Sequence, residues 1–145
     1  MEIINRKARF DYEIEDEYEA GIVLKGTEIK SIRNGKANIK DSYAIIRNNE
    51  LYLLNTHISL YEEGNRFNHE ETRTRKLLMH KREILKLKDK IEKEGYTLIP
   101  LKMYFKGSIL KVLIGLAKGK KSYDKREAIK KRDTEREMQK IIKYR

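Results

Sequence analysis

The residues best suited to chemistry are cations set among hydroxyl groups in segment 72–76, which reads Thr-Arg-Thr-Arg-Lys. These three cations stand just before an apolar pair, Leu77 and Leu78. The planar guanidinium of arginine suits bidentate pairing with phosphate and stacks on bases. The sequence therefore predicts contacts with a nucleic acid from Arg73, Arg75 and Lys76.

Six carboxylates crowd residues 11–19 and could indicate a metal site or an acid/base pair. They are Asp11, Glu13, Glu15, Asp16, Glu17 and Glu19. On a strand, alternate residues share one face, so the odd-numbered acids would lie opposite Tyr12 and Ile14. That pattern is typical of a solvated strand face, which we favour over a catalytic cluster.

No complete catalytic or metal-binding motif is present. His57, His69 and His80 lack the spacing of a zinc protease, and the chain has no cysteine. Segment 115–122 resembles a phosphate-binding loop, but Lys121 stands where Ser or Thr would bind magnesium. We therefore predict no enzyme activity, no metal and no cofactor.

The net charge of +11 over 145 residues is concentrated towards one end. Residues 1–116 hold 22 Lys/Arg against 18 Asp/Glu, whereas residues 117–145 hold 12 against 5. Such a field attracts a polyanion, either nucleic acid or an acidic membrane surface, although surface lysines can also serve solubility alone. No apolar run approaches the ~18 residues of a membrane span, and disulfides are impossible. A soluble, cytoplasmic protein is the expectation.

Hydrophobic alternation predicts several short strands and two hairpins. The expected strands are residues 10–14, 19–24, 42–47, 50–54, 96–105 and 109–116. Asn48 and Asn49 tolerate positive φ and suit a tight turn, and a second hairpin should turn at 106–108. Pro100 cannot donate to a sheet, so we expect it at an edge or a bulge.

Helices are expected at 27–33 and at about 80–94, the second with a buried stripe of Ile84, Leu87 and Ile91. A helix between the fourth and fifth of five or six strands favours a small OB-like antiparallel β-barrel, mainly β with two to three helices. Barrels of this type often bind oligonucleotides, which is an analogy of fold. The barrel should span residues 1–116. The basic tail, 117–145, should be disordered when free and helical on a partner.

Ordered blocks along the whole chain resemble the SmpB family. They are Asn5-Arg6-Lys7-Ala8, Asp11-Tyr12, Glu19-Ala20-Gly21-Ile22, 26–33 (GTEIKSIR), 35–38 (GKAN), 73–78 (RTRKLL), 95–98 (GYTL), 117–121 (AKGKK) and 123–126 (YDKR). The resemblance implies an OB-like barrel that binds the tRNA-like domain of tmRNA. It also implies a tail that occupies the empty decoding centre and mRNA channel of the small subunit of stalled ribosomes during trans-translation, with elongation factor Tu involved indirectly through the tmRNA complex.

The resemblance carries specific residues with it. The implied RNA-binding set, in addition to the three cations of 72–76, is Asn5, Arg6, Lys7, Tyr12, Glu19, Leu78, Lys118, Lys120 and Lys121. The implied ribosome-contacting tail residues are Tyr123, Asp124, Lys125, Arg126, Lys130, Lys131 and Arg132. Glu19 can accept hydrogen bonds from base or ribose donors, and Leu78 offers apolar surface to a splayed base.

Two positions depart from the family pattern. Phe10 stands where relatives usually have histidine, and Glu70-Glu71 stands where they often have Asp-Pro. The sequence leaves two other classes of function open. One is a structural ribosomal protein or general single-strand-binding module, and the other is an RNA-processing enzyme, which no sequence motif supports.

Overall fold

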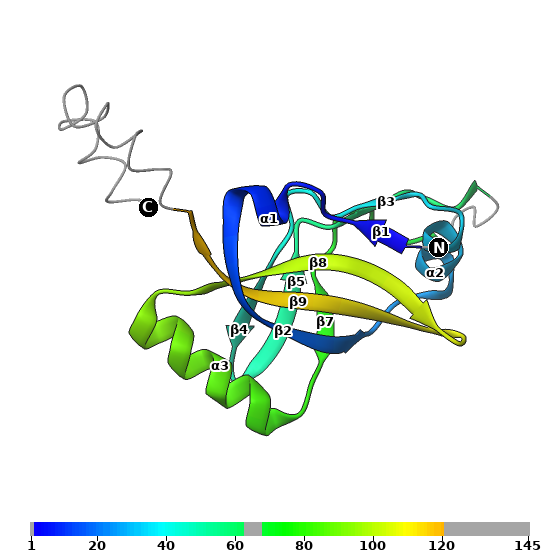
Figure 1. Cartoon of the computed structure of the whole chain (residues 1–145). Helices are drawn as coiled ribbons and strands as arrows, with labels where there is room; N and C mark the ends of the chain where they lie inside the picture. Colours follow the sequence, from blue (N-terminus) through cyan, green and yellow to red (C-terminus); the bar gives the residue numbers. More distant parts are fainter. Residues whose placement is uncertain (1, 63–67, 121–145) are drawn as a thin grey trace, which may run out of the picture.

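The strands of the computed structural model, which describes residues 2–62 and 68–120, join into an antiparallel sheet that closes into a ring (Figure 1). In hydrogen-bonded order the sheet is β1 (Glu2–Ile4), β8 (Thr97–Lys106), β4 (Tyr43–Arg47), β5 (Glu50–Leu54), β7 (Arg75–Leu78), β2 (Tyr12–Ile22) and β9 (Ile109–Gly119). β9 also pairs with β8 along its length, which closes the ring. The mainly β, small OB-like fold predicted from the sequence is confirmed.

Three helices and a small second sheet complete the described fold. The helices are α1 (Ala8–Asp11), α2 (Gly26–Arg33) and α3 (Lys81–Glu94), and the two-stranded sheet pairs β3 (Ala37–Asn38) with β6 (His57–Ile58). α3 lies between β7 and β8 in the chain and runs along one side of the ring (Figure 1). No helix within the described ranges is long and apolar enough to cross a membrane.

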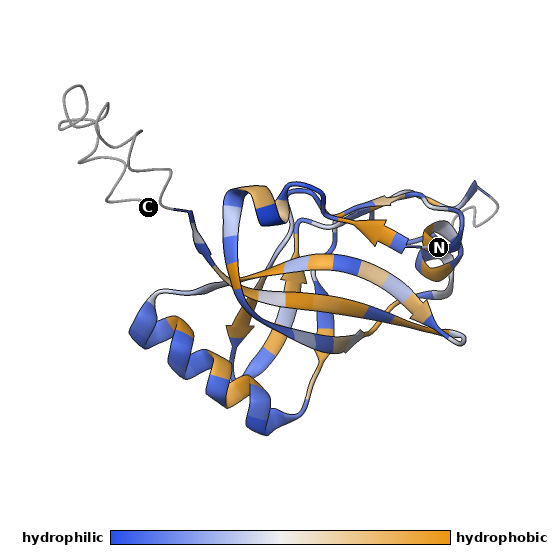
Figure 2. Ribbon diagram, in the orientation of Figure 1, coloured by the Kyte–Doolittle hydropathy of each residue, from blue (hydrophilic) through white to orange (hydrophobic). Residues whose placement is uncertain are grey.

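The core fills the inside of the ring with aliphatic side chains that alternate along the strands. The fully buried members include Leu51, Leu53, Leu77, Leu98, Met103, Val112, Ile114 and Leu116. A smaller cluster lies on the other side of β8 and β9, where Ala8 of α1 packs with Ile99, Leu101 and Ala117. Strands β8 and β9 are therefore buried on both faces near α1, while the outer side of α3 is hydrophilic (Figure 2).

Local sequence signals placed the hairpins and the long helix correctly. Asn48 and Asn49 have φ of 53° and 61° in the turn between β4 and β5, and Gly107 has φ of 68° between β8 and β9. Pro100 lies at a register shift of β8. α3 ends where Gly95 takes the left-handed conformation, and Ile84 and Leu87 are buried on its inner face, with Ile91 partly buried against the same core.

Three predictions about the elements were wrong. Phe10 and Asp11, expected to begin a strand, belong to the short helix α1, in which Ala8 is buried in the smaller cluster while Phe10 is 75% exposed. The strands expected at 10–14 and 19–24 are one strand, β2, with an irregularity between Ile14 and Asp16. The described chain also has nine strands, not five or six.

The expected boundary after residue 116 falls inside a strand. β9 continues to Gly119, and the fully buried Ala117 pairs with both Ile14 and Thr97. Lys120 is still tied to the sheet, since its backbone N–H donates to the Asp11 carbonyl at 3.1 Å. The conformation expected for the tail concerns residues that, after 120, lie outside the described part of the chain.

Candidate nucleic-acid interface

Glu19 is held in place on the outer face of the ring by two side chains of β8. The Tyr104 hydroxyl donates a hydrogen bond to its carboxylate, and Lys106 Nζ lies 3.3 Å from Glu19 Oε1. The hydrogen bond from Tyr104, with a smaller contribution from Lys106, lowers the pKa of Glu19 below its ordinary value. Burial and then the Glu19 carboxylate raise the pKa of Tyr104 to about 12, so its hydroxyl remains a donor at neutral pH. Glu19 is therefore a fixed, exposed, ionised acceptor.

Leu78 belongs to the same outer face because β2 and β7 pair with Gly21 opposite Leu78. Directly opposed residues of antiparallel strands point to the same side, and Glu19 and Gly21 share a side because they are two apart. Leu78 is 49% exposed, and its side chain lies over Gly21, where a Cβ would come within 3.5 Å of it. Leu78 therefore packs directly over Gly21, beside the acceptor.

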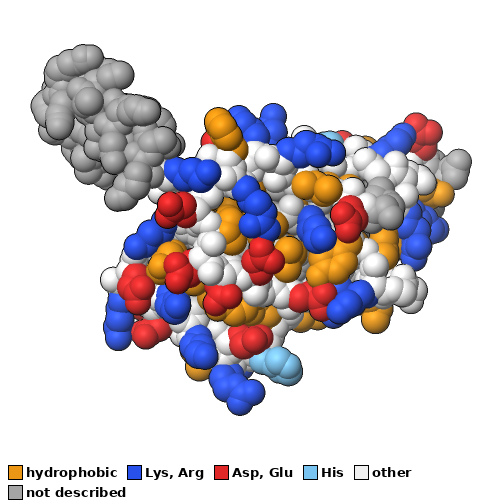
Figure 3. All heavy atoms as spheres, in the orientation of Figure 1, with side chains coloured by type: hydrophobic (Ala, Val, Ile, Leu, Met, Phe, Trp, Pro, Cys, Tyr) orange, Lys and Arg blue, Asp and Glu red, His pale blue; other side chains and the backbone are white. Residues whose placement is uncertain are grey.

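Outward residues of β1, β8 and β9 continue this face. Lys102 Nζ lies 3.4 Å from Glu2 Oε2 and 5.2 Å from the centroid of the Tyr104 ring. Figure 3 shows cationic, anionic and apolar side chains interspersed over these strands rather than separated. A surface of mixed charge with a partly exposed tyrosine ring and an exposed leucine suits recognition of bases and riboses in a folded RNA, whereas a uniform basic patch binds phosphate alone.

Arg75 does not belong to this surface. Its side chain is 0% exposed, and Nε donates to Glu28 Oε2 at 2.7 Å. The remaining guanidinium N–H groups donate to four backbone carbonyls, those of Thr56, Glu70, Glu71 and Arg73. A direct phosphate contact, predicted from the sequence for Arg75, is incompatible with this burial. Arg75 instead joins α2 to the segments before β7.

Arg73 also donates to the buried carboxylate of Glu28, so most of its guanidinium is already hydrogen-bonded within the protein. Its Nε and Nη2 donate to the two oxygens of Glu28 at 2.9 and 2.7 Å, and its side chain is only 22% exposed. Burial opposes ionisation of Glu28. The hydrogen bonds from Arg73, from the Lys25 backbone and from Arg75 outweigh it, so the pKa of Glu28 lies below its ordinary value. Lys76 points outward, with Nζ 3.3 Å from Glu50 Oε2.

Asn5 is also largely internal, at 8% exposure. Its Nδ2 donates to the Ile39 carbonyl at 3.3 Å and to the Pro100 carbonyl at 3.0 Å, which ties the end of β1 to β8. Its Oδ1 is buried and accepts no hydrogen bond from any described residue. Arg6, next in sequence, is exposed and lines a groove with Arg9 and Lys102.

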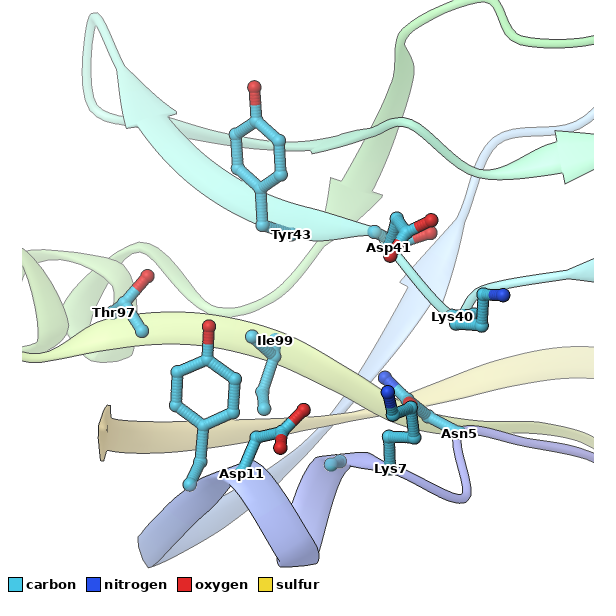
Figure 4. Close-up of a pocket in the computed structure, with 11 residues that line it drawn as sticks. Asn5, Lys7, Asp11, Lys40, Asp41, Tyr43, Thr97 and Ile99 are labelled. Carbon is cyan, nitrogen blue, oxygen red and sulfur yellow. The ribbon is translucent and has the colours of Figure 1, made fainter. Parts of the chain in front are cut away.

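Lys7 and Tyr12 lie on a different hollow, between α1 and the start of β4, which Figure 4 shows. Lys118, among the last paired residues of β9, and Lys120, directly after the strand, lie near this hollow because Gly119 pairs with Tyr12. Lys118 Nζ stands 4.5 Å from the centroid of the Tyr96 ring. The remaining predicted residues lie outside the described part of the chain, namely Lys121, Tyr123, Asp124, Lys125, Arg126, Lys130, Lys131 and Arg132.

The predicted RNA-binding residues therefore fall into three places. Glu19 and Leu78 share the outer face, and the residues of the α1 hollow lie at the other end of the ring. Arg75 lies inside. Sequence reasoning missed Tyr104 and Lys106, because only the pairing of β8 with β9 and of β9 with β2 brings them to Glu19.

The histidines and carboxylates do not assemble a site for a metal among residues 2–62 and 68–120. His69 is buried, with Nδ1 2.9 Å from Thr27 Oγ1 and Nε2 2.9 Å from the Ile58 carbonyl oxygen. Both ring nitrogens are thus used to hold the loop before β7 against α2. The carboxylates Glu13 and Glu15 are exposed opposite the half-buried Tyr12 and Ile14, as expected for a solvated strand face.

Comparisons with known proteins agree along nearly the whole chain. Residues 2–144 match the family described as SmpB protein. The chain is 62% identical over 141 residues to an SsrA-binding protein of Carboxydothermus hydrogenoformans, covering 97% of this chain and 95% of the relative. It is 60% identical over 141 residues to an SsrA-binding protein of Staphylococcus aureus strain Newman, covering 97% and 92%.

A solved structure is similar in fold as well as in sequence. It is described as "tmRNA-SmpB: a journey to the center of the bacterial ribosome", and its matching chain superposes with a TM-score of 0.70 at 52% identity. The match covers 86% of this chain and 87% of the other.

Proposed function

This chain belongs to the SmpB family, and we propose that it binds the tRNA-like domain of tmRNA and delivers it to stalled ribosomes for trans-translation. It acts in the cytoplasm as an RNA-binding protein and not as an enzyme. Its tail enters the vacant decoding centre and mRNA channel of the small subunit, and elongation factor Tu takes part only through the tmRNA complex.

One observation carries the assignment of the RNA-binding face: a carboxylate held ready as an acceptor in a protein with net charge +11. An unpaired carboxylate would repel a polyanion. Glu19 is instead oriented by Tyr104 and partly neutralised by Lys106, so it can accept from a base amine or a ribose hydroxyl. Leu78, beside it, supplies apolar surface for an unstacked base.

Cations on the outer face and at the α1 hollow supply the phosphate contacts, and Lys121, outside the described part of the chain, is expected to add to them. We assign this role to Arg6, Lys7, Lys76, Lys118, Lys120 and Lys121. Arg73 and Arg75 act indirectly, by fixing β7 and therefore Leu78. Asn5 likewise orders the junction of β1 with β8. The tail residues Tyr123 to Arg126, with Lys130, Lys131 and Arg132, contact the ribosome.

Binding of full-length protein to the tRNA-like domain, to an ordinary tRNA and to an unstructured oligonucleotide tests the proposal. We expect Glu19→Gln to weaken binding to the tRNA-like domain about tenfold, as for loss of a charged hydrogen-bond acceptor. Glu92→Gln on α3 removes the same charge far from the face and should leave affinity equal or slightly higher. Equal affinity for all three RNAs would instead indicate a general single-strand-binding module.

The division between ring and tail has its own test. Asp124→Ala combined with Lys125→Ala should leave tmRNA affinity intact and abolish peptide tagging on stalled ribosomes. If this variant loses tmRNA affinity as severely as Glu19→Gln, the two faces are not separate.

A further inference from the structure

The hollow between α1, β4 and β8 is a second place where the described fold could accept part of a ligand. It has a volume of about 320 Å³, within the usual range of small-molecule sites, roughly 300–1,000 Å³. Figure 4 shows Tyr43 rising from β4 on one wall, Thr97 and Ile99 on β8, and Lys7 and Asp11 on the side of α1. Tyr12, at the start of β2, also lines it.

Two tyrosines on this hollow have hydroxyl groups without an internal hydrogen-bond partner in the described chain. Tyr43 is 38% exposed on β4, and Tyr12 is partly exposed. Neither hydroxyl has a hydrogen-bond partner among residues 2–62 and 68–120, whereas Tyr96 and Tyr104 donate to Glu15 and Glu19. Tyr12 packs partly against the smaller apolar cluster, whereas the more exposed ring of Tyr43 is available for stacking on a base, since every base has a π-face.

Asn5 forms a fixed part of the wall of this hollow. Asn5 is more than nine-tenths buried and lines the hollow, and its Oδ1 has no donor in the described chain. Its amide nitrogen is already committed to the Ile39 and Pro100 carbonyls, so the side chain is fixed. A buried acceptor without a donor is unfavourable.

The charges of the hollow favour a nucleotide over a simple anion. Lys7 and Lys40 are matched by Asp11 and Asp41, so the lining has no net positive charge. Phosphate alone would meet two carboxylates there. A nucleotide can place its base amines towards the aspartates and its phosphate towards the lysines at the rim, near which Lys120 leaves the sheet.

We propose that this hollow binds one unstacked nucleotide of the RNA, with its base against the rings of Tyr43 and Tyr12 and its phosphate at Lys40 and Lys7. The inference rests on the proposed function and adds to it a subsite separate from Glu19 and Leu78. Tyr43 and Lys40 are its diagnostic residues, because the resemblance assigns a role to neither.

Affinity and its salt dependence, measured with full-length protein and the tRNA-like domain of tmRNA, separate stacking from charge. Tyr43→Leu keeps apolar bulk but removes the π-face, so we expect binding about tenfold weaker with an unchanged slope of log K against log salt. Tyr43→Phe should restore affinity. Lys40→Gln should reduce the slope by about 0.7–0.9, as for one lost phosphate contact. Lys93→Gln, on α3 outside the hollow, is the matched control for Lys40→Gln and should leave both affinity and slope unchanged.

A second arm does not depend on tmRNA. In NMR titrations, adenosine 5′-monophosphate should shift the Tyr43 ring and the Asn5 side-chain amide, while inorganic phosphate at the same concentration should not. Equal shifts with both would identify an adventitious anion site and overturn the proposal, as would unchanged affinity of Tyr43→Leu. If the tRNA-like domain fails to bind but the nucleotide still shifts Asn5 and Tyr43, the proposed function fails and the subsite stands.

Discussion

Replacement of Arg75 should damage the fold rather than an RNA contact. Arg75→Leu removes a guanidinium that donates to Glu28 and to four backbone carbonyls. The arginine side chain itself is fully buried. Removing one partner of a buried pair costs about 3–5 kcal/mol because the other charge is left buried. Glu28 retains Arg73 and the Lys25 N–H, which places the expected loss near 3 kcal/mol. That is a large part of a typical stability of about 5–15 kcal/mol.

Urea denaturation followed by circular dichroism measures this loss, with an unchanged m-value expected. Arg73→Gln is the control, because its side chain is partly exposed and should cost about 1–2 kcal/mol. At low temperature, where Arg75→Leu remains folded, the salt slope of tmRNA binding should match that of the unmodified protein. A loss of stability below about 1 kcal/mol together with a smaller salt slope would refute the structural role and restore a phosphate contact to Arg75.

Three further outcomes are expected. The folded-state pKa of Glu28 is lowered, so its contribution to stability is present above the ordinary carboxyl pKa of about 4.3 and is lost as pH falls below it. Glu28→Gln should accordingly flatten the acid side of the stability profile measured by urea titrations at several pH values. Gly95→Ala forces a side chain into the left-handed conformation at the end of α3 and should lower the free energy of unfolding by about 1 kcal/mol in the same assay. Lys118→Gln should lower the salt slope of tmRNA binding by about 0.7–0.9 in a shift assay, and an unchanged slope would remove Lys118 from the phosphate contacts.

Features with short-range causes were predictable from the sequence. The turn at Asn48-Asn49 and the end of α3 at Gly95 follow from residues that tolerate positive φ, and both occur where expected. The buried stripe of α3 follows from helical spacing. α1 was missed because four residues carry too little periodicity to separate a helical turn from an alternating strand.

The candidate site was less predictable because its parts meet only through the closed sheet. Tyr104 and Glu19 are separated by 85 positions, and no local signal joins them. Their contact requires the register that sets Glu19 opposite Leu113, Leu113 opposite Lys102, and Tyr104 opposite Lys111. Composition indicated a polyanion partner, but it could not distinguish a positioned carboxylate from a solvated one.

The inward orientation of Arg75 could have been predicted from the alternation of side chains along β7. If Leu77 is a core residue, then Arg75, two positions before it on β7, must point inward as well, while Lys76 and Leu78 point outward. An inward arginine requires a buried carboxylate, and Glu28 of α2 is fully buried beside it. Because β7 pairs with β2, the same alternation that hides Arg75 sets Leu78 next to Gly21 and on the side of Glu19. One arginine thus fixes the strand from within, and its neighbour three positions on, Leu78, stays exposed on the outer face.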